Sequence, residues 1–262
     1  MKNLTILSIL LIFFYSCSSD DDNSSSDNKF VPASLSYNGQ IEQQMKYDSN
    51  SRLTYILIKG DSYMPTAEVY ITYDEKGDVS LLRVVEDGSE NLYKVEIKDF
   101  SVYINNKFRF KIGQRQEISK YYYIESSEAY FHWIFDEYGR IIEHNYVDKK
   151  DFAYEVSKYE YDNKPGYASK INTPLWLLQY LDTSHDFHIL HSSFPSLFLS
   201  TQNNISEYET YTRHKKEDGS VLIKEHYKAK VNYDYGKNNM PISYKVTGAY
   251  FLKGDYTISY NQ

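Results

Sequence analysis

The sequence lacks a second cysteine: Cys17 is the only one among its 262 residues. No intramolecular disulfide can form, and the stability of the fold has to come from buried apolar surface. A long apolar run is missing as well. The longest one, Leu4–Phe14, would rise only about 16 Å as a helix, against roughly 30 Å of bilayer hydrocarbon. It is therefore too short to be a membrane-spanning helix.

An excess of basic residues is also absent. The chain has 29 Lys and Arg against 36 Asp and Glu, a formal net charge of −7. Phosphate binding depends on clustered basic side chains, so this balance argues against a nucleic-acid partner. The sequence contains no Gly-x-Ser-x-Gly elbow, no phosphate-binding glycine loop and no dinucleotide fingerprint. We therefore expect neither a cofactor nor nucleic acid.

The N-terminus has the organisation of an export signal. Lys2 supplies the positive charge, Leu4–Phe14 the apolar segment, and Ser16 a small residue before Cys17. This segment resembles the lipobox of bacterial lipoproteins, although Tyr15 stands where a small residue is usual. The resemblance implies that residues 1–16 are a signal peptide. It also implies that Cys17 carries diacylglycerol and a further fatty acid such as palmitate, which together anchor the protein to a membrane.

Residues 17–29 form a polar segment behind that cysteine. Residues 18–28 contain no apolar side chain, so we expect a flexible tether. Acidic residues at this place resemble the surface-export signal of lipoproteins from one Gram-negative phylum, which implies a cell-surface position on the outer membrane. The alternative is a solubilising spacer on the periplasmic side. The residues of this tag are Ser18, Ser19, Asp20, Asp21 and Asp22.

The remaining residues, 30–262, have the composition of a β-sheet protein. Twenty-nine tyrosines and thirteen phenylalanines accompany only eleven glycines and six prolines, and aromatic residues favour strands. Apolar and polar residues alternate along the chain, as where Val69 and Ile71 lie opposite Thr72. We predict a single all-β domain, a large antiparallel meander of roughly fourteen to sixteen strands. The sheet should be curved, as a half-barrel or barrel-like structure.

The segment 130–135 departs from this alternation. Phe131, Trp133 and Phe135 would lie on one face and Tyr130 and Ile134 on the other. Both faces are apolar, so we expect this strand to be central in the sheet and covered on both sides.

A short motif recurs between the strands: an aromatic residue, an aspartate and, in most copies, a glycine two to four residues later. Asp48 and Asp74 are 26 residues apart, as are Asp136 and Asp162, which fits two strands and two turns. The aspartate can accept hydrogen bonds from turn N–H groups, and glycine supplies a positive φ. The predicted turn formers are Asp48, Asp74, Gly77, Asp136, Gly139, Asp162, Gly166, Asp234 and Gly236.

This motif is similar to the tyrosine/aspartate repeats of long bacterial surface proteins and toxins. Together with the lipobox and the stretch 159–164, it resembles a family of bacterial lipoproteins catalogued as a domain of unknown function with a porin-like fold. The resemblance implies an antiparallel, barrel-like sheet and carries no catalytic residue. Charged residues on one face of a strand, such as Lys107, Arg109 and Lys111, argue against a sheet that spans the membrane.

Residues 172–200 interrupt the strand pattern. Thr173 and Pro174 can begin a helix, and we predict a short helical insertion near 172–200 that covers or fills the sheet. It could be the wall of a cleft or a plug of aromatic side chains, and the plug is favoured. His185, His188 and His191 invite a zinc site, but their spacing turns them apart on a helix, so no metal site is assigned.

Three functions remain open for the mature protein. The first is a non-catalytic module that binds a glycan or another envelope protein, with Trp133, Trp176 and Tyr180 as candidate ligand-binding platforms. The second is a polysaccharide hydrolase, which needs two carboxylates about 5–10 Å apart in a cleft. The third is a carrier that shelters a lipid or another apolar ligand. No catalytic residue is assigned, and we regard catalysis as the less favoured alternative.

Overall fold

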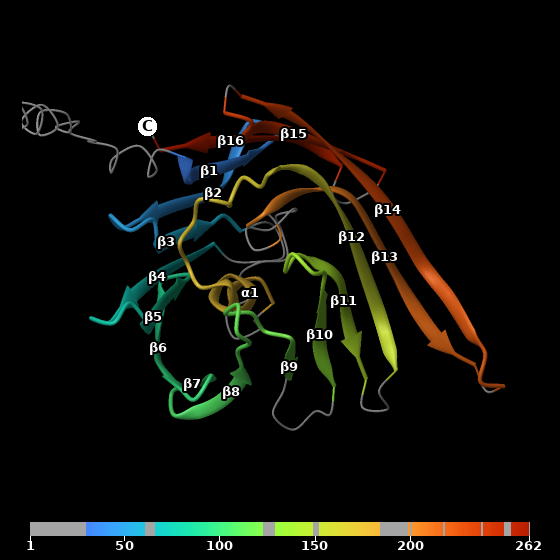
Figure 1. Cartoon of the computed structure of the whole chain (residues 1–262), viewed down its shortest axis with the longest axis horizontal. Helices are drawn as coiled ribbons and strands as arrows, with labels where there is room; N and C mark the ends of the chain where they lie inside the picture. The colour runs from blue at the N-terminus through green and yellow to red at the C-terminus, as the bar shows by residue number, and fades with distance from the viewer. Residues whose placement is uncertain are drawn as a thin grey trace, which may run out of the picture.

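The structure of this chain is a computed structural model that describes residues 30–60, 66–122, 129–148, 152–183, 199, 201–216, 218–236, 238–248 and 253–261. The predicted signal peptide, Cys17 and the export tag Ser18–Asp22 lie outside these residues. The strands form one antiparallel sheet of sixteen strands (Figure 1), in the order β8-β7-β6-β5-β4-β3-β2-β1-β16-β15-β14-β13-β12-β11-β10-β9.

The first eight strands are β1 Pro32–Tyr37, β2 Gln40–Tyr47, β3 Leu53–Ile58, β4 Ala67–Tyr73, β5 Val79–Glu86, β6 Ser89–Lys98, β7 Ser101–Ile104 and β8 Lys107–Lys111. The second eight are β9 Lys120–Tyr122, β10 Tyr130–Phe135, β11 Ile141–Val147, β12 Ala153–Pro165, β13 Asn203–Lys215, β14 Val221–Tyr235, β15 Pro241–Thr247 and β16 Gly254–Tyr260. The helix α1 spans Leu175–Thr183, between β12 and β13.

The sheet is nearly closed into a barrel. The first and last strands pair with each other, with Pro32 opposite Tyr260, so the termini of the meander meet in the middle of the sheet order. The two outermost strands, β8 and β9, follow each other in the chain and are joined near their ends by the single bridge between Ile112 and Ile118. The predicted fold class, an antiparallel barrel-like sheet with a short helical insertion, is confirmed.

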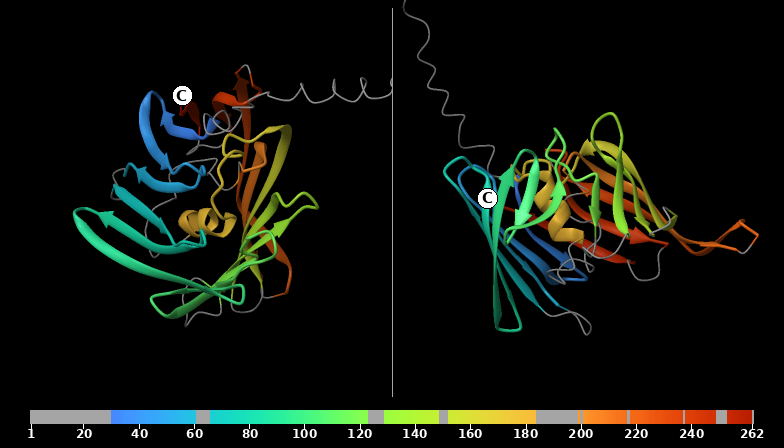
Figure 2. Two further views of the ribbon diagram at one scale, coloured as in Figure 1. Left: turned by 60° about the vertical axis from the view of Figure 1, so that its left-hand side comes forward. Right: turned by 90° about the horizontal axis from the view of Figure 1, so that it is seen from below.

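Helix α1 lies inside the curve of the sheet, close to the seam between β8 and β9 (Figures 1 and 2). The side-chain amide of Gln179 bonds the backbone of Ile118 twice: its Oε1 accepts from the N–H at 2.7 Å, and its Nε2 donates to the carbonyl at 3.0 Å. The N–H of Trp176 donates to the carbonyl of Gln116. The helix thus supplies the segment before β9 with partners that a neighbouring strand would otherwise provide.

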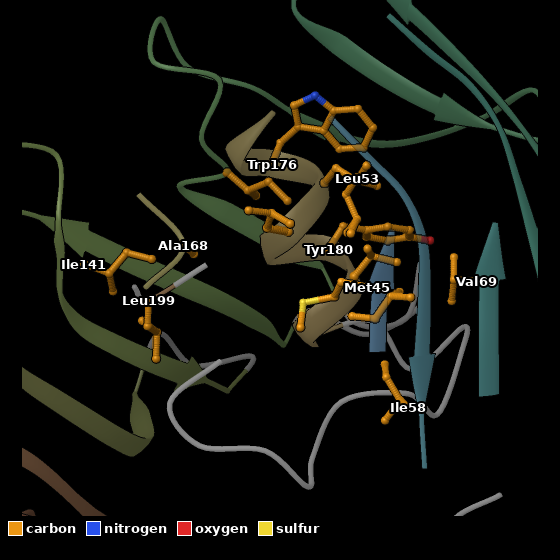
Figure 3. Packing of buried hydrophobic residues seen from close by; sticks show 14 of the residues in the cluster. Met45, Leu53, Ile58, Val69, Ile141, Ala168, Trp176, Tyr180 and Leu199 are labelled. Carbon is orange, nitrogen blue, oxygen red and sulfur yellow. The ribbon is translucent and has the colours of Figure 1, made fainter. Parts of the chain in front are cut away.

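The core fills the space between the helix and the sheet. Figure 3 shows the rings of Trp176 and Tyr180 near Leu53 of β3 and Met45 of β2. All four side chains are buried, and Val69 of β4 is completely so, as its alternation with polar neighbours predicts. Trp176 and Tyr180 therefore match the predicted plug of aromatic side chains, whereas residues 172–175 of the same insertion line a cleft that is described below. Phe187, Phe194 and Phe198 lie outside the described residues.

The prediction for β10 is wrong. We expected a central strand covered on both faces, but β10 is next to the outermost strand β9. Trp133 is buried, whereas Ile134 on the opposite face is 36% exposed. A nearly closed sheet has one interior, and Ile134 lies on the face that points away from it.

No helix in the described part of the chain is long and apolar enough to cross a bilayer.

In a meander, consecutive turns lie at alternate ends of the sheet. One end carries short turns such as Asn38-Gly39 and Asp87-Gly88, whose positive φ angles of 48° and 80°, and 47° and 78°, suit two-residue hairpins. The opposite end, which we call the turn rim, carries the turns 48–52, 74–78, 113–117, 136–140 and 236–240 and both ends of the connection 166–202. Two strands separate one copy of the motif from the next, so the copies at Asp48 and Asp74 lie at the same rim.

Candidate ligand-binding site at the turn rim

Three turns at this rim have the same geometry and begin with Asp48, Asp74 and Asp136. In each, the backbone N–H of the aspartate donates to the carbonyl of the residue four positions later. The backbone carbonyl of the aspartate accepts from the N–H of the residue three positions later. Its Oδ1 atom accepts two further N–H groups at 2.9–3.0 Å. The fourth turn residue has a positive φ, 88° at Gly77 and 84° at Gly139, as a three-residue hairpin loop with a bulge requires.

Two of the predicted turn aspartates lie elsewhere. Asp162 is inside β12, and its carboxylate accepts from the N–H groups of Lys164 and Asn204 and from the hydroxyl of Tyr235. It holds β12, β13 and β14 together at the point where the chain leaves the sheet. Asn204, which sequence reasoning missed, is completely buried there.

Asp234 is inside β14, where its Oδ2 accepts from the Ser243 hydroxyl at 2.9 Å. The turn after β14 begins two residues later, at Gly236. The backbone of Gly236 makes the two hydrogen bonds that the first aspartate makes in the turns at Asp48, Asp74 and Asp136. Gly166 follows β12, and its N–H donates to the carbonyl of Gln202 at 2.8 Å. Both strands continue past the aspartate because their neighbours pair with them further along.

The turns at Asp48 and Asp136 each belong to a larger network. The Arg52 guanidinium contacts Asp48 Oδ2 through Nε and Nη2, both at 2.7 Å, and lies 4.4 Å from the Tyr73 ring centroid. The hydroxyl of Tyr73 donates to the carbonyl of Leu53, the residue after the arginine, at 2.9 Å. Burial raises the pKa of Tyr73 to about 12, so this hydroxyl remains a donor near neutral pH.

The second network repeats these contacts. Arg140 Nε donates to Asp136 Oδ2 at 2.7 Å, its guanidinium lies 5.1 Å from the Tyr161 ring, and the Tyr161 hydroxyl donates to the Ile141 carbonyl at 2.7 Å. Burial alone would raise the pKa of both aspartate carboxyls. Hydrogen bonds from the arginine and from turn N–H groups outweigh it, so the pKa of each carboxyl is lowered.

An open cleft of about 690 Å³ lies beside the first network. Its walls come from three turns and from the two ends of the long connection. The lining residues are Asn50, Arg52, Gly77, Arg115, Gln116, Ile171, Asn172, Thr173, Pro174, Leu175, Thr201 and Gln202. Amide, hydroxyl and guanidinium groups dominate, and none of these described residues is an aspartate or glutamate.

Arg115 reaches this cleft from the turn 113–117, which sequence reasoning missed because glycine, not aspartate, begins it. Its Nη2 donates to the carbonyl of Glu137 at 3.1 Å, so the side chain lies over the next turn. Gly139 makes room for it, since a Cβ atom there would lie 2.5 Å from Arg115 Nη1.

The proposed aromatic platforms are not exposed at this site. Trp133, Trp176 and Tyr180 are 0–1% exposed, and all three pack in the core. A ring buried on both faces offers no surface on which a sugar could stack, so the structure gives these residues a packing role. Sequence reasoning could not find this, because strand and helix periodicity do not tell an interior ring from an accessible one.

A buried histidine lies beside one of these rings. His144 stacks on Trp133, with ring centroids 5.2 Å apart and planes 5° apart. Burial lowers the pKa of His144 to about 4, so it is neutral near pH 7. Within the described ranges, no group of three potential ligands is placed to hold a metal ion. His185, His188 and His191 lie outside those ranges.

Comparison with known proteins identifies no family. No protein-family model matches the sequence, and no curated protein matches it. A solved structure of a porin-like protein from Bacteroides vulgatus is similar, with 19% identity and a TM-score of 0.36, over 87% of this chain and 91% of that one. A porin-like protein from Bacteroides uniformis is 8% identical with a TM-score of 0.36, over 78% of this chain and 94% of that one.

Proposed function

We propose that this chain is a lipid-anchored protein of the outer-membrane surface that binds a glycan without chemical conversion, in the cleft at the turn rim. The observation that supports binding most directly is the lining of the cleft. Side-chain amides and hydroxyls both donate and accept hydrogen bonds, as sugar hydroxyls require. The cleft is open to solvent, which suits a chain of sugars better than a small enclosed molecule.

The two other functions find less support at this cleft. A glycoside hydrolase needs a pair of carboxylates, and the described lining residues include none. A lipid carrier needs an apolar cavity, but the region around α1 is filled by side chains such as Trp176 and Tyr180. An envelope protein as the partner of the same rim is an outcome that the binding experiment below can reveal.

The test is glycan binding by the full chain in detergent micelles. Asn50→Trp should obstruct the cleft without disturbing its turn, because the turn uses the backbone N–H of Asn50. We expect a glycan array to give discrete hits for the unsubstituted protein and loss of those hits in Asn50→Trp.

Tyr138→Trp is the matched control. Tyr138 has the position in the turn 136–140 that Asn50 has in the turn 48–52, and it does not line the cleft. The Tyr138→Trp variant should therefore retain the glycan hits of the unsubstituted protein. Absence of hits from the unsubstituted protein, or equal binding by Asn50→Trp, would contradict the proposal. If cross-linking on cells captures one defined protein at this rim instead, the ligand is an envelope protein and the glycan assignment fails.

The anchor is tested separately. Cells fed with labelled palmitate should mark the protein, and Cys17→Ala should abolish the label. Protease added to intact cells should degrade the unsubstituted protein if it is on the surface. Resistance until the outer membrane is opened would place it on the periplasmic side.

A further inference from the structure

We infer that the glycan bound in the cleft is acidic, and that the guanidinium of Arg115 binds its carboxylate or sulfate group. This inference rests on the proposed function and narrows its ligand class.

The charges around the cleft are the first argument. Two guanidinium groups line it, and no carboxylate does among the described lining residues. Arg52 is committed to Asp48, with both contacts at 2.7 Å. Among the described residues Arg115 has no carboxylate partner, and its guanidinium hydrogen bond goes to a backbone carbonyl. Among the described lining residues, one cation without a carboxylate partner therefore remains in the cleft of a chain whose net charge is −7.

A nearby acid does not cancel this charge directly. Glu117 lies in the same turn as Arg115, but its Oε2 accepts from the backbone N–H of Arg115 at 2.8 Å. Its carboxylate lies over Gly113, where a Cβ atom would be 2.1 Å from Oε1. The carboxylate is thus folded onto its own turn and serves as a turn acceptor.

The exposed side chain of Arg115 is restrained without a ligand, by its hydrogen bond to the Glu137 carbonyl and by the space over Gly139. Gly139 has a φ of 84°, which other residues rarely adopt, and its missing side chain leaves the space that Arg115 and the Gln202 amide occupy. A held arginine loses less conformational freedom on binding and can present two parallel N–H groups to a carboxylate or sulfate.

The remaining lining residues favour an acidic sugar as the ligand and argue against a polyphosphate. Asn50, Gln116, Asn172 and Gln202 provide neutral amides around a single unneutralised cation. Nucleic acids and polyphosphates require several cations, whereas a uronic acid or a sulfated sugar carries one charge among several hydroxyls.

The experiment compares the full chain, in detergent micelles, on an array of neutral, carboxylated and sulfated glycans. Isothermal titration with hyaluronan and dextran sulfate then separates carboxylate from sulfate recognition, and dextran is the neutral probe. We expect the hits to be acidic. Arg115→Gln should weaken them by about tenfold or more, because charge-assisted hydrogen bonds are the strong ones. Added salt should weaken binding to the unsubstituted protein more than to Arg115→Gln.

Arg83→Gln is the matched control, because it removes the same charge from the outer wall, where Arg83 pairs with Glu90. It should bind like the unsubstituted protein, and both variants should unfold at the same urea concentration. Discrete neutral hits that Arg115→Gln leaves unchanged would overturn the inference and leave the proposed function standing. Acidic hits that are equally strong in both variants would overturn the role of Arg115. Absence of any hit would overturn both proposals.

Discussion

Two copies of one local network stand at the turn rim, one built on Asp48 and the other on Asp136. Within each copy an aspartate, an arginine and a tyrosine make the same contacts, with Arg–Asp distances of 2.7 Å in both. Their surroundings differ. Arg52 borders the cleft of about 690 Å³, whereas Arg140 borders a space of about 10 Å³ and donates to Asn203 Oδ1 at 3.2 Å.

This difference separates local structure, which is the same in both copies, from the tertiary surroundings, which are not. The contacts inside each copy join residues at most 25 positions apart, so similar local sequences produce them twice. Beside Arg140 lie Leu199 and Asn203 of β13, which come from a distant part of the chain and do not line the cleft at Arg52. The same motif can therefore serve binding in one place and packing in another.

The largest expected effect comes from a buried side chain of α1, the helix that borders both networks. Leu175 of α1 lines both spaces, and the neighbouring Trp176 is completely buried. Trp176→Ala should lower the free energy of unfolding by about 3–5 kcal/mol, measured by urea unfolding of the full chain. Tyr138→Ala, at a ring that is 65% exposed, should change it by less than about 0.5 kcal/mol. Similar losses for the two variants would show that α1 does not hold the core.

The next effect distinguishes the two aspartates. Asp48→Asn and Asp136→Asn should each cost about 1–2 kcal/mol of unfolding free energy, because a charge-assisted hydrogen bond is lost at a partly buried arginine. Asp136 is 15% exposed and Asp48 23%, so less water can replace the lost carboxylate at Asp136. Urea unfolding at pH 7 should show the larger loss for Asp136→Asn, and the reverse order would contradict the comparison.

The pH dependence follows from the lowered pKa values of these two carboxyls. A carboxyl with a lowered folded-state pKa stabilises the fold at pH values above its unfolded pKa, about 3.9. That contribution is lost as the pH falls through the folded-state pKa. The urea midpoint of the unsubstituted protein should fall between pH 6 and pH 3, and that of the double variant Asp48→Asn/Asp136→Asn should fall less. Parallel curves would show that these carboxyls do not contribute.

The smallest effect should be nearly equal in the two copies. Tyr73→Phe and Tyr161→Phe each remove one hydroxyl that donates to a backbone carbonyl. Each should cost about 1 kcal/mol, the typical net value of such a hydrogen bond. A difference much larger than the error of urea unfolding would show that the two networks are not energetically equivalent.

Much of the fold could be predicted from local patterns. Period-two alternation placed residues such as Val69 inside, and aspartate followed by glycine marked the turns at Asp74 and Asp136, because strand faces and turn N–H groups depend on neighbouring residues. The same rule failed at Asp162 and Asp234. Both strands continue there because a partner strand pairs with them, which is a non-local effect.

The candidate site could be predicted only in part. Nothing near Arg115 in the sequence indicates that its side chain lies on Gly139, or that Gln202 and Asn50 belong to the same cleft. Trp176 was a plausible platform until the sheet enclosed it.

By itself, the sequence determined an antiparallel sheet without disulfides, the chemistry of most of its turns and a short helical insertion near 172–200. These features depend on side-chain alternation and on hydrogen bonds between close neighbours. Only the tertiary structure decided that the sheet nearly closes, that the tryptophans are interior, and that one arginine lies in a cleft without a carboxylate partner among the described residues. Those outcomes require residues more than a hundred positions apart to meet, and the curvature of the whole sheet determines which of them do.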